Sequence, residues 1–399
     1  MSTSAPHLPA RPIALLSAAA FVSAATMRVA DPLVPQVAAE FGATPGVAGG
    51  VVVTAFAVSY GLCQLLWGPV GDRHGKYRVV AALTLASAAT VATAALAGSL
   101  GTLALARLVS GVTAAALIPL AMAFIGDHVA YERRQAVIAR FLTGQITGLV
   151  AGQVFGGVFG DTVGWRGVFL LLAGLYLLVG VLLLRESRSG RLPAPVLKAP
   201  AGPGRLLTGY LALLRRPWTR VVLAVVFVEG AVFFGAFAFV GAYLHARFGY
   251  TYTAVGGLLA AYGAGGLLFA ATVRALVDRL GERGLAAVGG VLICLGLLAL
   301  AATPFSAIVP LAIGVVGLGF YMLHNTLQTN ATQMAPEARG LAVSAFASCF
   351  FLGQAAGAWL GGMVADQAGF PALFVAAGPL VLLLALGFAR ALGRRPSTA

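Results

Sequence analysis

A short charged turn occurs twice in this chain, each time between two long apolar runs. The first copy, at 68–78, has the sequence Gly-Pro-Val-Gly-Asp-Arg-His-Gly-Lys-Tyr-Arg, and a degraded copy lies at 274–284. An offset of 206 residues aligns Asp278 with Asp72, Arg279 with Arg73 and Gly281 with Gly75. A recurring turn of this kind indicates that the chain consists of two copies of one unit.

The apolar runs between these turns limit the solvent in which the chain can fold. Hydrophobic residues make up 60% of its 399 residues, charged residues only 10%, and the mean hydropathy is +0.94. Soluble domains carry about 25% charged residues, so this chain cannot hide its apolar surface inside a water-soluble particle. The sequence therefore predicts a membrane protein.

The length of the runs sets the number of spans. A helix that crosses the hydrocarbon core needs about 20 mostly apolar residues. Twelve segments, called helix 1 to helix 12 below, satisfy this requirement: 12–36, 45–67, 79–98, 102–125, 138–160, 166–184, 219–244, 253–272, 285–303, 306–329, 341–362 and 370–390. We therefore predict an all-α membrane protein with twelve transmembrane helices in two six-helix bundles related by pseudo-symmetry.

The longest polar interval divides the chain. It covers 185–218, is rich in proline and arginine, and predicts a cytoplasmic linker with a short amphipathic helix around 206–214 on the membrane surface. We expect an N-terminal bundle at 1–184 and a C-terminal bundle with a short tail at 219–399. Because each bundle has an even number of spans, the two copies run in the same direction and can pack around an axis along the membrane normal.

The net charge of +14 follows topology. With both termini placed in the cytoplasm, all but four of the 26 lysines and arginines fall in cytoplasmic segments. This asymmetry is the one that orients membrane proteins. We therefore expect an integral protein of the plasma (inner) membrane with cytoplasmic termini, embedded in the lipid bilayer, and no nucleic-acid partner.

Two glycine patterns add detail. Asp161, Gly164 and Trp165 recur at an offset of 205 as Asp366, Gly369 and Phe370. Helix 5 also has glycines at every fourth position, which form one smooth stripe for close helix packing. We expect helix 8, itself rich in glycine, to pack against that stripe, which comprises Gly144, Gly148, Gly152 and Gly156.

These motifs resemble the major facilitator superfamily of secondary transporters over essentially the whole chain. The family motif Gly-x-x-x-Asp-Arg-x-Gly-x-x-Arg is met by Gly68, Asp72, Arg73, Gly75 and Arg78. Helix 4 has the family's Arg-x-x-x-Gly element at 107–111, and the Trp-Arg pair at 165–166 is typical of the entry to helix 6. The segment Asp-Pro-Leu-Val-Pro at 31–35 is similar to the drug-proton antiporter and arabinose-efflux branch.

The resemblance implies a gate in the loop between helices 2 and 3. Gly68 and Gly75 would allow close packing and a tight turn. Asp72 would lie at the positive N-terminus of helix 11, near residue 340, and Lys76 would pair with Asp127 at the end of helix 4. Arg73 and the second copy, Asp278 and Arg279, belong to the same gating set. The alternative is a solvated loop that only sets topology.

Charges inside the spans are the sharper functional signal, because each is costly in hydrocarbon unless it is paired or wet. Arg28 and Asp31 are three residues apart on helix 1, Arg107 lies in helix 4, and Glu229 lies near the middle of helix 7. Burial favours the protonated form of a carboxyl group, so Asp31 and Glu229 are candidates for proton coupling. Arg28 and Arg107 are candidates for binding a substrate anion. The alternative is a structural role, with Asp31 permanently bound to Arg107 and Glu229 hydrogen-bonded to a hydroxyl across a helix contact.

Three polar side chains in the spans have open assignments. Gln145 and Gln354 can line a substrate site, or they can hold helices together by hydrogen bonds. His324, in helix 10, can relay protons, but a packing or capping role is favoured. The chain has neither a phosphate-binding loop nor metal-ligand spacing, so we expect no cofactor, no metal and no direct use of ATP.

These observations predict a monomeric secondary transporter, not an enzyme, that moves a small organic solute by alternating access. Export of a drug, sugar or metabolite in exchange for protons is the leading function. Proton-coupled uptake of an organic anion is the alternative, favoured by Arg28 and Arg107 and by Gln153, which stands where antiporters of the resembled family have proline. A lipid flippase or a multispan enzyme is less favoured, because no catalytic constellation lies at either membrane face.

Overall fold

The computed structural model describes residues 10–197 and 203–394. Within these residues the chain is helical and contains no strand. The helices of the first half are α1 (Ala10–Arg28), η1 (Asp31–Leu33), α2 (Val34–Glu40), α3 (Pro45–Gln64), α4 (Trp67–His74), α5 (Lys76–Ala95), α6 (Leu100–Ala114), α7 (Leu117–His128) and α8 (Tyr131–Arg188). Those that follow are α9 (Pro203–Arg215), α10 (Pro217–Phe237), α11 (Val240–Phe248), α12 (Tyr252–Ala302), η2 (Ser306–Ile308), α13 (Val309–Gln333), η3 (Pro336–Ala338), α14 (Arg339–Ala368) and α15 (Phe370–Gly393).

Ten helical stretches of the described chain are long and apolar enough to cross a membrane. Two of them, α8 and α12, are each a pair of spans, because the backbone reverses inside them at Gly164 and Gly281. The ten stretches therefore contain the twelve predicted spans, and the prediction of a twelve-helix all-α membrane protein is confirmed.

The reversals lie at the repeated glycines. Gly75 has φ +88° and its repeat partner Gly281 has φ +60°. Gly164 and Gly369, matched at an offset of 205, have φ +69° and +84°. A residue with a side chain rarely adopts these angles, so glycine allows one span to turn sharply into the next. Both repeats in the sequence thus encode the same backbone feature.

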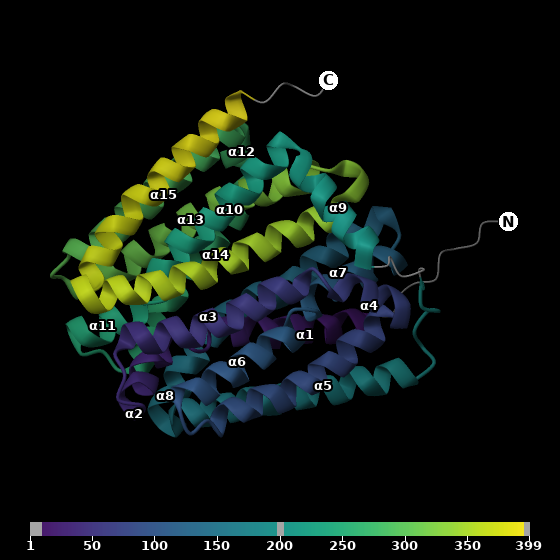
Figure 1. Cartoon of the computed structure of the whole chain (residues 1–399), viewed down its shortest axis with the longest axis horizontal. Coiled ribbons are helices and arrows are strands. Elements are labelled where there is room, and N and C mark those ends of the chain that lie inside the picture. Colours follow the sequence, from purple (N-terminus) through teal and green to yellow (C-terminus); the bar gives the residue numbers. More distant parts are fainter. Residues whose placement is uncertain (1–9, 198–202, 395–399) are drawn as a thin grey trace.

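Each half of the molecule has its own core of buried apolar side chains. One cluster draws on α1 to α8 and adds Ala242 of α11, and the second draws on α9 to α15 and adds Val53 of α3. In Figure 1 the purple and blue helices of the first half lie below the green and yellow helices of the second. We call the end that carries the charged turn at 68–78 the basic end, and the other the opposite end. In the predicted orientation they are cytoplasmic and external.

Two helix pairs make most of the contact between the halves, and α11 and the start of α12 add smaller contacts with α2 and η1. The helices α3 and α14 lie side by side along the boundary (Figure 1), and α8 contacts α12. Glycines at these contacts bring backbones together: a Cβ at Gly46 would overlap the carbonyl oxygen of Gly362, and one at Gly157 would overlap that of Tyr252. The halves therefore meet through close backbone packing.

The prediction for the glycine stripe of helix 5 is wrong. The stripe packs on α1, and a Cβ at each of its glycines would meet backbone atoms there, the pairs being Gly144 with Ser17, Gly148 with Phe21, Gly152 with Ala25 and Gly156 with Val29. Helix 1 and helix 5 run in the same direction and touch at every fourth residue. Each glycine of the stripe therefore packs against the backbone of one successive turn of helix 1. Helix 8 instead meets the adjacent face of helix 5, at Gln153 and Gly157.

The amphipathic helix expected at 206–214 is α9. Its Tyr210 hydroxyl donates a hydrogen bond to the carbonyl of Leu65 at the end of α3, at 3.4 Å, and Gly209 approaches Leu341 of α14. The linker helix therefore touches both halves at the basic end. The chain ends, 1–9 and 395–399, and the linker segment 198–202 lie outside the described residues, and the domain boundaries at 184 and 218 stay predictions.

Candidate functional site

Helix 1 is interrupted where its charged pair lies. The regular helix α1 ends at Arg28. The next turn, η1, begins at Asp31, and Pro32 is its second residue. Arg28 Nη1 lies 3.7 Å from Asp31 Oδ2, and the two residues are 7% and 1% exposed. The Asp31 carboxylate interacts with Arg28 and with the side-chain amide of Gln153, but neither of its oxygens makes a close hydrogen bond within the described chain. The pair is thus buried with open hydrogen-bonding capacity.

Arg28 lies at the boundary between the halves. Its guanidinium carbon is 3.9 Å from the ring centre of Phe234, a residue of α10. A cation over an aromatic face is attracted by the electron density of the ring, and the attraction increases when water is excluded. The guanidinium of Arg28, a residue of the first half, therefore packs against a side chain of the second half.

Glu229 has a partner that the sequence did not reveal. Glu229 is fully buried, and its Oε2 lies 2.8 Å from Nδ1 of His324 on α13. The other oxygen, Oε1, has no hydrogen-bond partner in the described chain. The two residues are 95 positions apart, so no local pattern joins them. The available signal was that His324 is the one histidine inside a predicted span.

Aromatic rings enclose the imidazole of His324. Phe320 stacks on it at 5.0 Å with an interplanar angle of 14°, and Phe350 of α14 lies at 4.7 Å. Phe320 in turn contacts Phe233, Phe234 and Tyr262. The second half therefore packs the partner of its buried acid, His324, into an aromatic cluster, and one ring of that cluster, Phe234, also contacts Arg28.

Amide side chains add further polar atoms near the boundary. Gln354 of α14 and Gln153 of α8 are 4% and 1% exposed. Gln354 Oε1 lacks a hydrogen-bond partner among the described residues, and Gln153 Nε2 makes no close hydrogen bond there, although the Gln153 side chain interacts with Asp31. Gln145 is half-buried. Buried polar groups are normally hydrogen-bonded, so unpaired atoms in α1, α8, α10 and α14 are candidates to bind water or a polar solute.

Arg107 is placed differently from Arg28. It is 1% exposed, its side chain donates to the carbonyls of Thr26 and Val52 at 3.4 Å, and its guanidinium lies 4.4 Å from the ring centre of Phe56. These partners belong to α1 and α3, so Arg107 ties helices 1, 2 and 4 together. The ion pair of Asp31 in this structure is with Arg28, and not with Arg107.

At the basic end, the structure brings Lys76 together with Asp72 and Asp127. Lys76 Nζ lies 2.7 Å from Asp127 Oδ2 and 2.6 Å from Asp72 Oδ1. Asp72 therefore pairs with a residue of its own half, and the described chain contains no hydrogen bond between it and the first turn of α14. Arg73 is exposed.

The packing glycine of this turn is Gly71, not Gly68. A Cβ at Gly71 would press on Leu120 of α7 at 2.5 Å, whereas one at Gly68 would meet nothing within 4 Å. The expectation that Gly68 allows close packing is therefore wrong for this conformation. Both glycines lie on α4, but of the two α7 approaches only Gly71. Gly75 makes the turn through its positive φ of +88°.

The second copy of the turn keeps a contact but changes its chemistry. Glu282 occupies the position of Lys76 at the offset of 206, and its Oε2 accepts a hydrogen bond from Asn330 Nδ2 at 3.0 Å. In the first half an ion pair therefore joins the start of helix 3 to the end of helix 4. In the second half a hydrogen bond from an asparagine amide joins the start of helix 9 to the end of helix 10. Asp278 and Arg279 are exposed.

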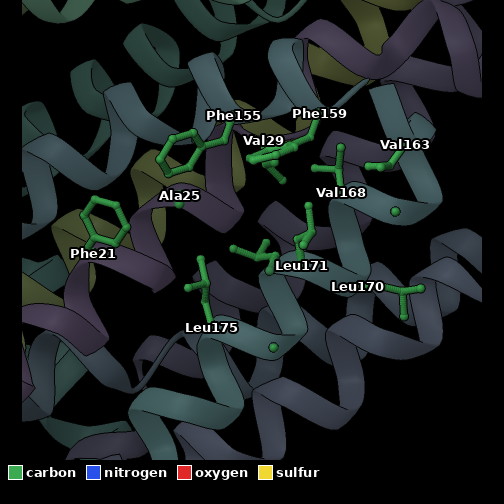
Figure 2. A pocket seen from close by; sticks show the side chains of 14 residues that line it. Phe21, Ala25, Val29, Phe155, Phe159, Val163, Val168, Leu170, Leu171 and Leu175 are labelled. Atoms are coloured by element: carbon green, nitrogen blue, oxygen red, sulfur yellow. The ribbon is translucent and has the colours of Figure 1, made fainter. Parts of the chain in front are cut away.

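A separate hollow of about 760 Å³ lies between α1 and both spans of α8. Figure 2 shows Phe155, Phe159, Leu171 and Leu175 turned toward it, with Ala25 on its wall. Its lining has no polar side chain. It therefore suits hydrocarbon rather than a polar solute, and it is distinct from the charged cluster at the boundary.

Known proteins resemble the chain in sequence. Residues 16–339 match the family model of the Major Facilitator Superfamily. The uncharacterized MFS-type transporter YfhI of Bacillus subtilis (strain 168) is 26% identical over 340 residues, which cover 83% of this chain and 81% of YfhI. YwfA, an uncharacterized MFS-type transporter of the same organism, is 27% identical over 284 residues, or 69% of this chain and 66% of YwfA.

Solved structures share the fold. A bacterial homologue of the human lysosomal transporter Spinster superposes with a TM-score of 0.79 at 17% identity, covering 99% of this chain and 100% of the homologue. The nucleoside transporter NupG gives a TM-score of 0.72 at 15% identity, covering 96% and 100% of the two chains. The matched sequence covers most of the chain, and the fold agrees. The chain belongs to the Major Facilitator Superfamily.

Proposed function

We propose that this protein is a proton-coupled exporter of a small organic solute, working by alternating access between its two halves. One observation carries the proposal: each half holds a buried acid beside a basic group, Asp31 with Arg28 in the first and Glu229 with His324 in the second. Arg28 contacts the second half directly. A rigid-body movement of the halves therefore changes the surroundings of these charges.

Asp31 and Glu229 are the proton-coupling groups of this proposal. A carboxylate buried in a span is expensive when it is charged and unpaired, so loss of its basic partner favours proton uptake. Movement of Arg28 away from Asp31, or of His324 away from Glu229, would load a proton. Return of the partner would release it. His324 thus joins the proton-coupling set.

Arg28 is the residue best placed to meet a solute. Its Nη1 makes no close hydrogen bond and lies 3.7 Å from Asp31 Oδ2, and its guanidinium lies on Phe234 between the halves. Gln354 and Gln145 are the further candidates for solute contact. Arg107 is less suited, because backbone carbonyls of two helices already occupy its guanidinium. We assign it to the framework of the first half.

The gate belongs to the basic end. We propose that Asp72, paired here with Lys76, moves to the N-terminus of α14 when the halves close at this end, while the ion pair of Lys76 with Asp127 is retained. The moving bodies are the segments 1–184 and 219–399, joined by the linker at 185–218. Arg73, Asp278 and Arg279 face water and would adjust their contacts as the ends approach.

Uptake of an organic anion together with protons is the second candidate. The seat of Arg28 on an aromatic ring favours it, because a guanidinium that is not neutralised by close hydrogen bonds can bind a carboxylate or phosphate. Gln153 also favours uptake, because it stands where antiporters of the family have proline. The two candidates differ in the direction of solute movement relative to the proton gradient.

Reconstitution tests the function and separates these candidates. Purified protein in liposomes, with an imposed pH gradient and no ATP, is screened with drugs, sugars, nucleosides and organic anions. Export coupled to protons predicts that the solute moves against the direction of proton flow, and uptake predicts movement with it. Solute movement that ignores the gradient would contradict both.

A further inference from the structure

The repeat also places a matched pair of aspartates at the opposite end of the molecule. Asp161 ends helix 5 and Asp366 ends helix 11, and each precedes its reversing glycine by three residues. These helices are the ones that join the halves. The two acids are therefore equivalent by pseudo-symmetry and lie on opposite sides of the boundary.

Asp161 caps a helix of the other half. Its Oδ1 accepts the backbone N–H of Tyr252 at 3.1 Å, and its Oδ2 accepts that of Thr253 at 2.7 Å. Both donors belong to the first turn of α12. The nearby approach of Gly157 to Tyr252 brings the two backbones close enough for these contacts.

Asp366 does the same in the reverse direction. Its Oδ1 accepts the backbone N–H of Gly46 at 3.0 Å, and its Oδ2 accepts the hydroxyl of Thr44 at 2.5 Å. Thr44 is the N-cap of α3, a helix of the first half. Close packing of Gly46 on Gly362 accompanies the contact. Each half thus supplies one acid and one capped helix.

The chemistry of both contacts is that of a helix cap supplied in trans. The first N–H groups of a helix have no partner within it, and a carboxylate there also meets the positive end of the helix dipole. Four hydrogen bonds cross the boundary at these two points. They persist only while the halves touch at the opposite end, so separation exposes both acids and both helix starts to water.

We propose that Asp161 and Asp366 form a two-point latch that holds the opposite end closed by capping α12 and α3 across the boundary. The latch rests on the proposed alternating access of the two halves. It acts opposite to the gate of the basic end, so opening one end would accompany closing of the other. Its symmetry gives each half an equal share in holding this end.

The test measures the conformation without a solute. Spin labels at Leu96→Cys and Phe305→Cys, exposed positions of different halves at the opposite end, report the separation by pulsed electron resonance in a chain whose three native cysteines are alanine. Losing an N-cap acceptor weakens a helix end enough to change an equilibrium about 2- to 30-fold. Each variant, Asp161→Ala or Asp366→Ala, should raise the ratio of long to short distances by such a factor. The double variant should show the product of the two.

Ser99→Ala is the matched control. Ser99 caps α6 at the same end but within its own half, so its loss removes a cap of the same kind without a cross-boundary contact. Its distance distribution should match that of the parent. A double aspartate variant that keeps the parent distribution would overturn the latch. A shift in distances with no solute movement in liposomes would support the latch and overturn the proposed transport, so the two failures are distinguishable.

Discussion

Glu229 is fully buried and hydrogen-bonds His324 at 2.8 Å, and its other carboxylate oxygen has no hydrogen-bond partner among the described residues. The sequence pointed to Glu229 because an acid in mid-span is rare, but the partner depends on how α10 and α13 cross. That crossing is a property of the packed bundle.

Replacing Glu229 by glutamine should separate coupling from folding. The amide keeps the shape and can still hydrogen-bond His324, but it cannot take up a proton. We expect flux driven by a pH gradient to fall to the level of empty liposomes, while the melting temperature stays near that of the parent. Flux at the parental rate would contradict the proton role.

His324→Ala should destabilise the protein in a pH-dependent way. Removing the hydrogen-bond partner of a buried carboxylate leaves its charge buried and unpaired, which costs about 3–5 kcal/mol. Proton uptake by Glu229 removes that charge, so the loss should be largest at alkaline pH and smaller at acid pH. Thermal unfolding in detergent across a pH series measures it. The double variant with Glu229→Gln, which has no charge to strand, should show a loss that does not vary with pH.

Arg107 and Arg28 should respond differently to truncation. A hydrogen bond from a charged donor contributes about 1.5–3 kcal/mol, and Arg107 makes such bonds to two helices. Arg107→Ala should therefore lower the melting temperature strongly. Arg28→Ala leaves Asp31 buried without its basic partner, so its loss of stability should be largest at alkaline pH and smaller at acid pH, where Asp31 takes up a proton. It should also weaken solute binding, measured by the concentration dependence of flux. A loss of stability in Arg28→Ala that does not vary with pH, with unchanged solute binding, would contradict the separate roles.

At the scale of elements, close packing of α1 on α8 depends on missing side chains. Gly148→Leu would drive its Cβ into the backbone at Phe21, and such overpacking costs about 1–3 kcal/mol. Gly174→Leu, in the later span of α8, is the matched control, because a Cβ there meets nothing within 4 Å. Thermal unfolding should separate the two variants. Similar melting temperatures would show that the stripe tolerates bulk.

The basic-end contacts of the two halves should also differ in importance. Lys76→Met leaves Asp72 and Asp127 facing each other without a cation, so we expect a several-fold loss of maximal transport rate. Glu282→Gln can keep its hydrogen bond to Asn330 and should change the rate little. Initial rates against solute concentration would compare them. Equal rates in the two variants would argue against a special gate in the first half.

For the molecule as a whole, the sequence sufficed for the spans, the repeat and the family, because each depends on local hydropathy or on residues at fixed offsets. The reversing glycines at 75, 164, 281 and 369 were likewise readable as repeats. Packing partners were not readable. The stripe of helix 5 was matched to the wrong helix, and Gly68 to the wrong contact, since glycine spacing shows that a helix can be approached closely but not by which neighbour.

The charged site shows the same limit. Arg28 and Asp31 could be paired from their spacing on one helix. The pair of Glu229 with His324, and the carbonyl partners of Arg107, required knowledge of how different helices face one another. The sequence showed Asp161 and Asp366 as a repeated pair. It did not show that each one accepts hydrogen bonds from the start of a helix in the other half.

Proton movement during transport tests the central claim most directly. Liposomes containing the protein and an internal pH-sensitive dye receive a gradient of a transported solute, with no pH gradient imposed and no ATP. Proton coupling predicts that the solute gradient alone changes the internal pH, and that Glu229→Gln abolishes this change. Solute movement at full rate with a constant internal pH would contradict the claim.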